Sequence, residues 1–201
     1  MRGSRRGWRS GPRRGILRRM AEILVTGFEP FRHWTRNSSW EGARLLSANL
    51  RDTVAECLPV DHAAAASALA AAVAREGPRV LLMAGLASDP VLRLEMLARP
   101  GPLAPWSAET RRGRWDWAAA LSTMRGAGLA VRVSRDAGGY VCDTTYWAAL
   151  GEAVPRVAFL HVPPPGPVWT PERVARAMAG MLAGAPRAGE RRRASVVPAL
   201  A

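Results

Sequence analysis

A cysteine and a histidine stand nineteen residues apart at positions that suit nucleophilic catalysis. Cys142 follows the turn-forming residues 136–139, and residues 140–150 contain neither Gly nor Pro, which predicts a helix carrying the thiol in its first turn. His161 ends the apolar run 157–160, where a buried strand of an α/β sheet would present a functional group. The pair therefore predicts a cysteine nucleophile with a histidine base.

The predicted position of the thiol has chemical consequences. Unpaired backbone N–H groups at a helix N-terminus favour a thiolate, so we expect the pKa of Cys142 to lie below its reference value of about 8.5. The same N–H groups can stabilise an oxyanion, and His161 can move the proton from the thiol to a leaving amine. Taken alone, however, a free cysteine is most often a small buried hydrophobe and a lone histidine is structural. Both interpretations stay open at this point.

Further motifs resemble a known family. Residues 23–31 read ILVTGFEPF and residues 37–41 read NSSWE. This opening is similar to that of pyroglutamyl peptidase I, the pyrrolidone carboxyl peptidase family of cysteine peptidases. More blocks follow in the family's order, at residues 58–60 and 84–87 and around Glu95, Cys142 and His161. The resemblance extends from about residue 22 to about residue 184.

The resemblance implies a catalytic role for three residues. Cys142 would be the nucleophile, His161 the general base and acid, and Glu95 the carboxylate that orients the imidazole and stabilises the imidazolium. Glu95 lies in the apolar segment 91–97, where a charged group needs a partner. From the residues alone, the alternative is an exposed glutamate on a strand.

The resemblance also implies a substrate. Phe28 and Phe31 would form apolar walls for the five-membered lactam of an N-terminal pyroglutamate, and Asn37, Tyr140 and Val141 would complete the pocket. The expected activity is that of a cysteine exopeptidase, which hydrolyses the bond after an N-terminal pyroglutamyl (5-oxoproline) residue through a thioester acyl-enzyme. From the phenylalanines alone, ordinary core packing is the alternative.

Two segments differ from the family pattern. Arg32 and His33 stand where the family has two glycines, so the loop lacks two positions that tolerate unusual backbone angles. Residues 88–102 also differ, although Arg93 lies close to the position where the family has an arginine. These departures leave open a second possibility, a catalytically weak or inactive family member that binds a pyroglutamyl-like ligand.

Charge divides the chain into three parts. The 201 residues carry a formal net charge of +13, and every basic residue is an arginine. Residues 1–19 hold eight arginines and no acid, and residues 187–201 hold four arginines and one glutamate, which leaves +2 for the rest. We therefore expect an Arg-rich, disordered extension at residues 1–19, one α/β domain at residues 20–186 and a basic tail at residues 187–201.

The resemblance implies a peptide with an N-terminal pyroglutamate as partner, and the composition points to no other class of ligand. Three histidines and two cysteines show no paired ligand spacing and the glycines form no phosphate-binding motif, so we predict no metal and no cofactor. No nucleic-acid motif accompanies the arginines, and no apolar stretch of about 18 residues suggests a membrane helix. We expect a cytoplasmic protein and allow for a homo-oligomer. For the tryptophans at 106, 115, 117 and 147, core packing is the preferred interpretation over an oligomer contact.

Alternating strand and helix patterns predict the fold class. We expect strands at residues 23–26, 53–58, 80–84, 129–133 and 157–161, helices at 38–50, 61–77, 115–125, 140–150 and 170–182, and a loop over 99–114. A capping box of Ser38 and Glu41 would begin the first helix. The pattern is typical of an α/β protein, a three-layer αβα sandwich with a mostly parallel twisted central sheet in a single domain.

Overall fold

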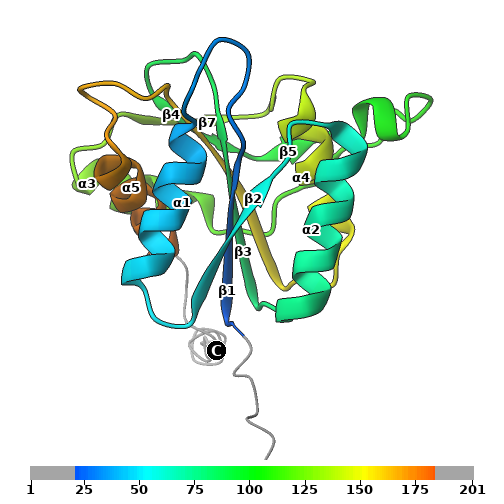
Figure 1. Ribbon diagram of the computed structural model, residues 1–201, viewed down its shortest axis with the longest axis horizontal. Coiled ribbons are helices and arrows are strands. Elements are labelled where there is room, and N and C mark those ends of the chain that lie inside the picture. Colours follow the sequence, from blue (N-terminus) through cyan, green and yellow to red (C-terminus); the bar gives the residue numbers. More distant parts are fainter. Residues whose placement is uncertain (1–20, 184–201) are drawn as a thin grey trace, which may run out of the picture.

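The computed structural model describes residues 21–183, so the predicted extensions at 1–19 and 187–201 lie outside the described residues. Strands and helices alternate along most of the chain as expected (Figure 1), but over residues 80–112 four strands follow one another with only a 3₁₀ helix among them. The strands are β1 (Ile23–Phe28), β2 (Thr53–Leu58), β3 (Val80–Leu86), β4 (Leu92–Glu95), β5 (Leu97–Ala98), β6 (Arg111–Arg112), β7 (Val131–Ser134) and β8 (Arg156–Val162). The helices are α1 (Ser38–Asn49), α2 (His62–Glu76), α3 (Trp117–Gly126), α4 (Val141–Gly151) and α5 (Pro171–Ala183), with a 3₁₀ helix η1 (Gly101–Leu103).

The central sheet has six strands in the order β2-β1-β3-β8-β4-β7. Neighbouring strands run parallel except at one junction, where β4 pairs antiparallel with β8. Strands β5 and β6 form a separate two-stranded antiparallel ribbon. The mostly parallel sheet predicted from the alternating pattern is confirmed.

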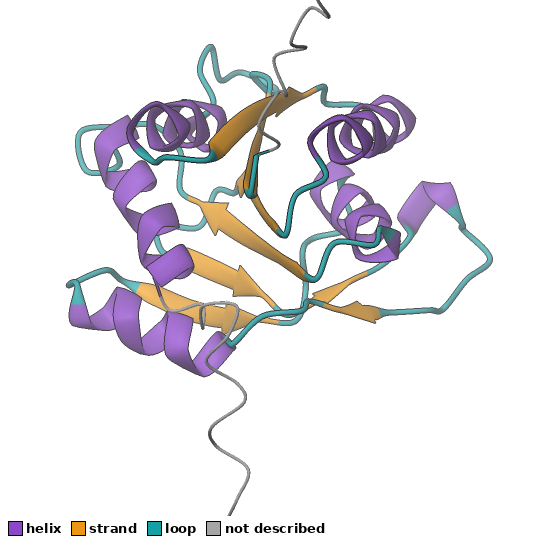
Figure 2. Ribbon diagram, turned by 90° about the horizontal axis from the view of Figure 1, so that it is seen from below, coloured by secondary structure: helices purple, strands orange, loops and turns teal. Residues whose placement is uncertain are grey.

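Helices cover both faces of this sheet. Helices α1, α3 and α5 lie on one face and α2 and α4 on the other, which gives three layers (Figures 1 and 2). Strand β3 supplies both cores, because Leu82 and Ala84 pack under the first group of helices and Leu81 and Met83 under the second. This double burial explains why the central strands read as continuous apolar runs rather than as alternating patterns.

The start of α1 differs from the sequence-based expectation. Asn37, not Ser38, is the N-cap, and its side chain accepts a hydrogen bond from the Ser39 amide. Ser38 is the first helical residue and donates its hydroxyl to the carbonyl of Pro163. The capping box predicted for Ser38 and Glu41 is therefore wrong, because the cap lies one residue earlier.

The segment expected to be a loop over residues 99–114 contains η1 and β6. The following helix begins at Trp117, with Asp116 as N-cap, two residues later than predicted. Trp106 lies in this segment and is 85% exposed, so core packing is wrong for this tryptophan. Trp117 is buried as expected.

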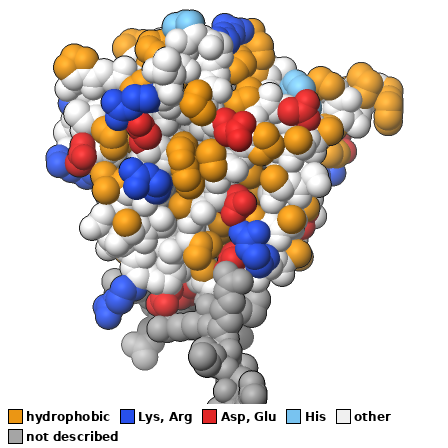
Figure 3. All heavy atoms as spheres, in the orientation of Figure 1, with side chains coloured by type: hydrophobic (Ala, Val, Ile, Leu, Met, Phe, Trp, Pro, Cys, Tyr) orange, Lys and Arg blue, Asp and Glu red, His pale blue; other side chains and the backbone are white. Residues whose placement is uncertain are grey.

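Two further features are the distribution of charge on the surface and the length and apolar character of the helices. On the face seen in Figure 3, arginines and acidic side chains are interspersed with apolar ones rather than gathered in a patch of one sign. Among residues 21–183, no helix combines the length and apolar character needed to cross a membrane.

Candidate active site

Three neighbouring strands and one helix N-terminus bring the predicted site residues together. His161 on β8 is in register with Gly85 on β3 and with Arg93 on β4. Glu95 follows Arg93 by two residues and so points to the same face of β4. Cys142 lies in the first turn of α4, as predicted. Its Sγ lies above Gly85, where an added Cβ would be only 2.6 Å from the sulfur.

Glu95 and His161 form a buried pair. The Oε1 atom of Glu95 lies 2.8 Å from Nδ1 of His161, and the two residues are 0% and 3% exposed. Glu95 is therefore not the exposed strand glutamate that the residues alone allowed. A buried carboxylate of this kind needs a partner, and the imidazole supplies one.

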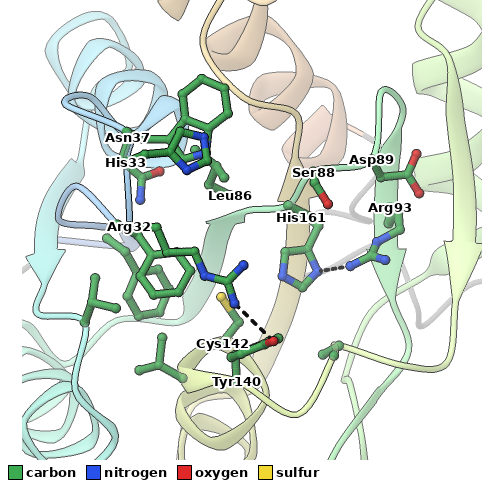
Figure 4. A pocket seen from close by; sticks show the side chains of 18 residues that line it. Arg32, His33, Asn37, Leu86, Ser88, Asp89, Arg93, Tyr140, Cys142 and His161 are labelled. Carbon is green, nitrogen blue, oxygen red and sulfur yellow. Dashed lines mark hydrogen bonds between the residues drawn. The ribbon is translucent and has the colours of Figure 1, made fainter.

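Arg93 is a third member of this cluster. Its Nη2 lies 3.1 Å from Nδ1 of His161 (Figure 4), and its Nε lies 3.1 Å from Oε1 of Glu95. Nδ1 can donate to Glu95 only when it carries a proton, and it can accept from Arg93 only when it does not. The carboxylate is the stronger partner and the guanidinium can turn to that same carboxylate, so the geometry favours a proton on Nδ1. Nε2 of His161 is then free to accept a proton.

Burial dominates the electrostatics of Cys142. Loss of solvent raises the pKa of the thiol to about 12, and the charges of Glu95 and Asp143 act in the same direction. The backbone amide of Cys142 and the charge of Arg93 lower the pKa, but by less. The lowered pKa expected from the helix N-terminus is therefore wrong, because desolvation outweighs the helix end. With this raised pKa, the Cys142 thiol is protonated at neutral pH.

Hydrogen bonds of two buried side chains, Asp143 and Thr144, fix the first turn of α4. The carboxylate of Asp143 accepts a hydrogen bond of 2.7 Å from the Arg99 amide, which ties the helix to the segment after β5. The hydroxyl of Thr144 lies 2.8 Å from Nδ1 of His62 at the start of α2. The position of Cys142 relative to the sheet is therefore set by elements on both sides of it.

A cavity of about 530 Å³ opens in front of the thiol and the imidazole (Figure 4). Glu95 lies behind His161 rather than on the cavity wall. Among the residues predicted from the sequence, seven line the cavity: Phe28, Phe31, Asn37, Tyr140, Val141, Cys142 and His161.

The predicted substrate-contacting residues differ in their surroundings. Phe28 is 2% exposed, whereas Tyr140 is 56% exposed and stands at the mouth. The amide of Asn37 donates to the carbonyl of Glu29 at 2.8 Å and accepts from the Ser39 hydroxyl at 2.7 Å. Its side chain thus holds the loop after β1 as well as bordering the cavity.

Sequence reasoning gave no role to several residues of the site. The sequence offered no sign that Gly85 would lie beneath the thiol, because that depends on strand order. For Arg93 the signal was its closeness to the family's arginine position, but its contacts with Glu95 and His161 also depend on strand order. Arg32 was noted only as a departure from a glycine, although its position next to Phe31 was a usable signal. The cavity wall also includes Trp34 and Asp89.

Comparisons with known proteins agree with this geometry. A pyrrolidone-carboxylate peptidase of Pseudomonas fluorescens is 32% identical over 192 residues, covering 82% of this chain and 89% of the relative. The crystal structure of pyrrolidone carboxyl peptidase from Thermus thermophilus superposes with a TM-score of 0.70 at 34% identity, covering 80% of this chain and 98% of the other. The chain belongs to the pyrrolidone carboxyl peptidase family.

More distant relatives also match over most of the chain. Human pyroglutamyl-peptidase 1 is 27% identical over 183 residues, covering 80% of this chain and 87% of the human protein. Pyrrolidone carboxyl peptidase from Thermococcus litoralis superposes with a TM-score of 0.74 at 20% identity, over 83% of this chain and 93% of that structure. No family model matches the sequence.

Proposed function

We propose that this protein is a cysteine exopeptidase that removes an N-terminal pyroglutamyl residue from peptides. The observation that carries the proposal is the buried Glu95–His161 pair, whose imidazole lines the same cavity as the Cys142 thiol. Membership of the pyrrolidone carboxyl peptidase family supports the same substrate, since relatives bear the names pyrrolidone-carboxylate peptidase and pyroglutamyl-peptidase.

In the proposed reaction, Cys142 attacks the carbonyl carbon that links the lactam ring to the next residue. Because its pKa is raised to about 12, the thiol must lose its proton as it attacks, and Nε2 of His161 receives it. The imidazolium that forms is stabilised by the carboxylate of Glu95. The same proton then passes to the leaving amine, and water hydrolyses the resulting thioester.

The environment of the cavity suits this substrate. In the first turn of α4 the amides of Asp143 and Thr144 donate to the Tyr140 carbonyl, and the Cys142 amide, which favours the thiolate, is the group that can stabilise the oxyanion. Phe28 and Phe31 offer flat apolar surfaces to a compact, uncharged ring, and Asn37, Tyr140 and Val141 border the same space. We assign these five residues to substrate binding.

The test is release of a fluorophore from a pyroglutamyl arylamide. We expect turnover by the native protein, loss of at least about a thousandfold in Cys142→Ala, and near-native turnover in Cys57→Ala. Cys57 is a suitable control because it is the other cysteine and lies on β2, outside the cavity. A prolyl arylamide, which lacks the lactam carbonyl, should not be cleaved.

Two results would contradict the proposal. Equal turnover by native protein and Cys142→Ala would exclude the thiol as nucleophile. Binding of 5-oxoproline in calorimetry by a folded native protein without turnover would instead support the inactive binding protein that the altered loops allowed.

A further inference from the structure

Arg32 places a positive charge at the mouth of the cavity. Its guanidinium carbon lies 5.0 Å from the ring centre of Phe31 and 5.2 Å from that of Tyr140, and its Nη2 donates to the Tyr140 hydroxyl at 3.1 Å (Figure 4). Arg32 is exposed, whereas Cys142 deeper in the cavity is 8% exposed. The two aromatic rings therefore hold an accessible guanidinium between solvent and the nucleophile.

The other permanent charges on the cavity wall are neutralised by protein groups. Arg93 is paired with Glu95, and Asp89 is paired with Arg132 at 2.5 Å. Within residues 21–183, Arg32 has no carboxylate at ion-pair distance, and its hydrogen-bond acceptor is a neutral phenol. A cation that lines a cavity with its charge unmatched favours an anionic ligand.

The backbone supplies an independent observation. Arg32 has φ = +56°, in the left-handed region that is unfavourable for a residue with a side chain. A glycine would adopt this conformation without strain. Strain of this kind at a cavity mouth is a reason to look for a function of the side chain that is held there.

The orientation of the bound peptide determines which part of it lies next to Arg32. This step rests on the proposed function. The lactam ring must enter the cavity for its carbonyl to reach Cys142, so the remainder of the peptide leaves through the mouth. We propose that Arg32 is a specificity residue that binds a carboxylate immediately after the pyroglutamyl residue. The preferred substrate class is then pyroglutamyl peptides whose second residue is acidic, or pyroglutamyl dipeptides with a free terminal carboxylate.

Calorimetry on Cys142→Ala, which cannot form the acyl-enzyme, tests this directly. Pyroglutamyl-glutamate amide is compared with pyroglutamyl-glutamine amide, and pyroglutamyl-alanine with its amide. We expect each anionic ligand to bind about fivefold more tightly than its neutral partner at low salt, and 0.5 M NaCl should reduce the difference. The two pairs distinguish a side-chain carboxylate from a terminal one.

Adding Arg32→Gln should abolish the preference for the anionic ligands, while Arg32→Lys should keep part of it. Arg44→Gln is the matched control, because Arg44 is exposed on α1 and does not line the cavity. Equal affinity within each pair, no detectable binding, or tighter binding of all ligands after Arg32→Gln would overturn the inference. Failure of the native protein to cleave any pyroglutamyl substrate would refute the proposed function alone, since the binding comparison does not need turnover.

Discussion

The floor and the mouth of the cavity are built in opposite ways. At the floor, His161 is buried and bonded to Glu95 behind it on the neighbouring strand, and Cys142 lies against Gly85. At the mouth, Arg32 is exposed on a loop in a strained conformation. The difference shows that the groups proposed to do chemistry are held by the sheet, whereas the residue proposed to select the substrate belongs to a loop that can vary without altering the sheet.

The largest effect is expected when the carboxylate charge behind the cavity floor is removed, compared with removal of a carboxylate charge on the loop after β1. Glu95→Gln should lower kcat by about a hundredfold to ten-thousandfold, because the imidazolium loses its stabilising carboxylate and Arg93 loses its ion-pair partner. Glu29→Gln, on the exposed loop that also carries Arg32 but outside the cavity wall, should change kcat by less than about threefold. Steady-state kinetics on the arylamide measures both. Comparable losses in the two variants would remove the distinction between floor and mouth.

A second test disturbs the floor without changing charge. In Gly85→Ala the new Cβ would lie 2.6 Å from the Cys142 sulfur and 2.9 Å from Phe159, so the thiol must shift. We expect a loss of about ten- to a hundredfold in kcat/KM, since small displacements of a reacting group are costly. Gly126→Ala, which meets no atom within 4 Å, is the control and should retain native turnover. Native activity in Gly85→Ala would mean that the thiol need not lie against β3.

The pH dependence of Cys142 alkylation tests whether the thiol at the cavity floor is protonated at neutral pH. With its pKa raised to about 12, Cys142 is almost entirely thiol at pH 7, and its thiolate fraction rises about tenfold per pH unit until pH approaches that pKa. In a Cys57→Ala background, the iodoacetamide reaction rate should therefore climb from pH 7 to pH 10. A rate that is flat between pH 6 and pH 8 would instead indicate a preformed thiolate and would contradict the dominance of burial.

The smallest effect is expected for Asn37, which anchors the loop between β1 and α1. Asn37→Ala removes the cap of α1 and the bond to the Glu29 carbonyl, and should lower the free energy of unfolding by about 1–2 kcal/mol. Asn49→Ala is the control, because its amide bonds only within the exposed end of α1 and alanine suits a helix. Urea denaturation measures both, and equal stabilities would show that the loop does not depend on Asn37.

Local sequence determined much of the fold. The turn at residues 136–139 followed by a run without Gly or Pro placed Cys142 in a first helical turn, and the apolar run before His161 placed the imidazole near a strand end. The helix expected over residues 61–77 is α2, which the Asp61 side chain caps at its start and Gly77 ends in the left-handed conformation. These features depend on neighbours in the chain, and that is why they could be predicted.

Only the tertiary structure decided the surroundings of these residues. The antiparallel pairing of β4 with β8 brings Arg93 and Glu95 to His161, and no local pattern specifies which strands become neighbours. The packing of α4 on the sheet buries Cys142 and reverses the expected direction of its pKa, because desolvation depends on everything that surrounds the thiol. The sequence by itself determined which groups stand at the ends of the elements. Their partners, burial and charge balance were decided by the order of the strands and the packing of the layers, which join residues far apart in the chain.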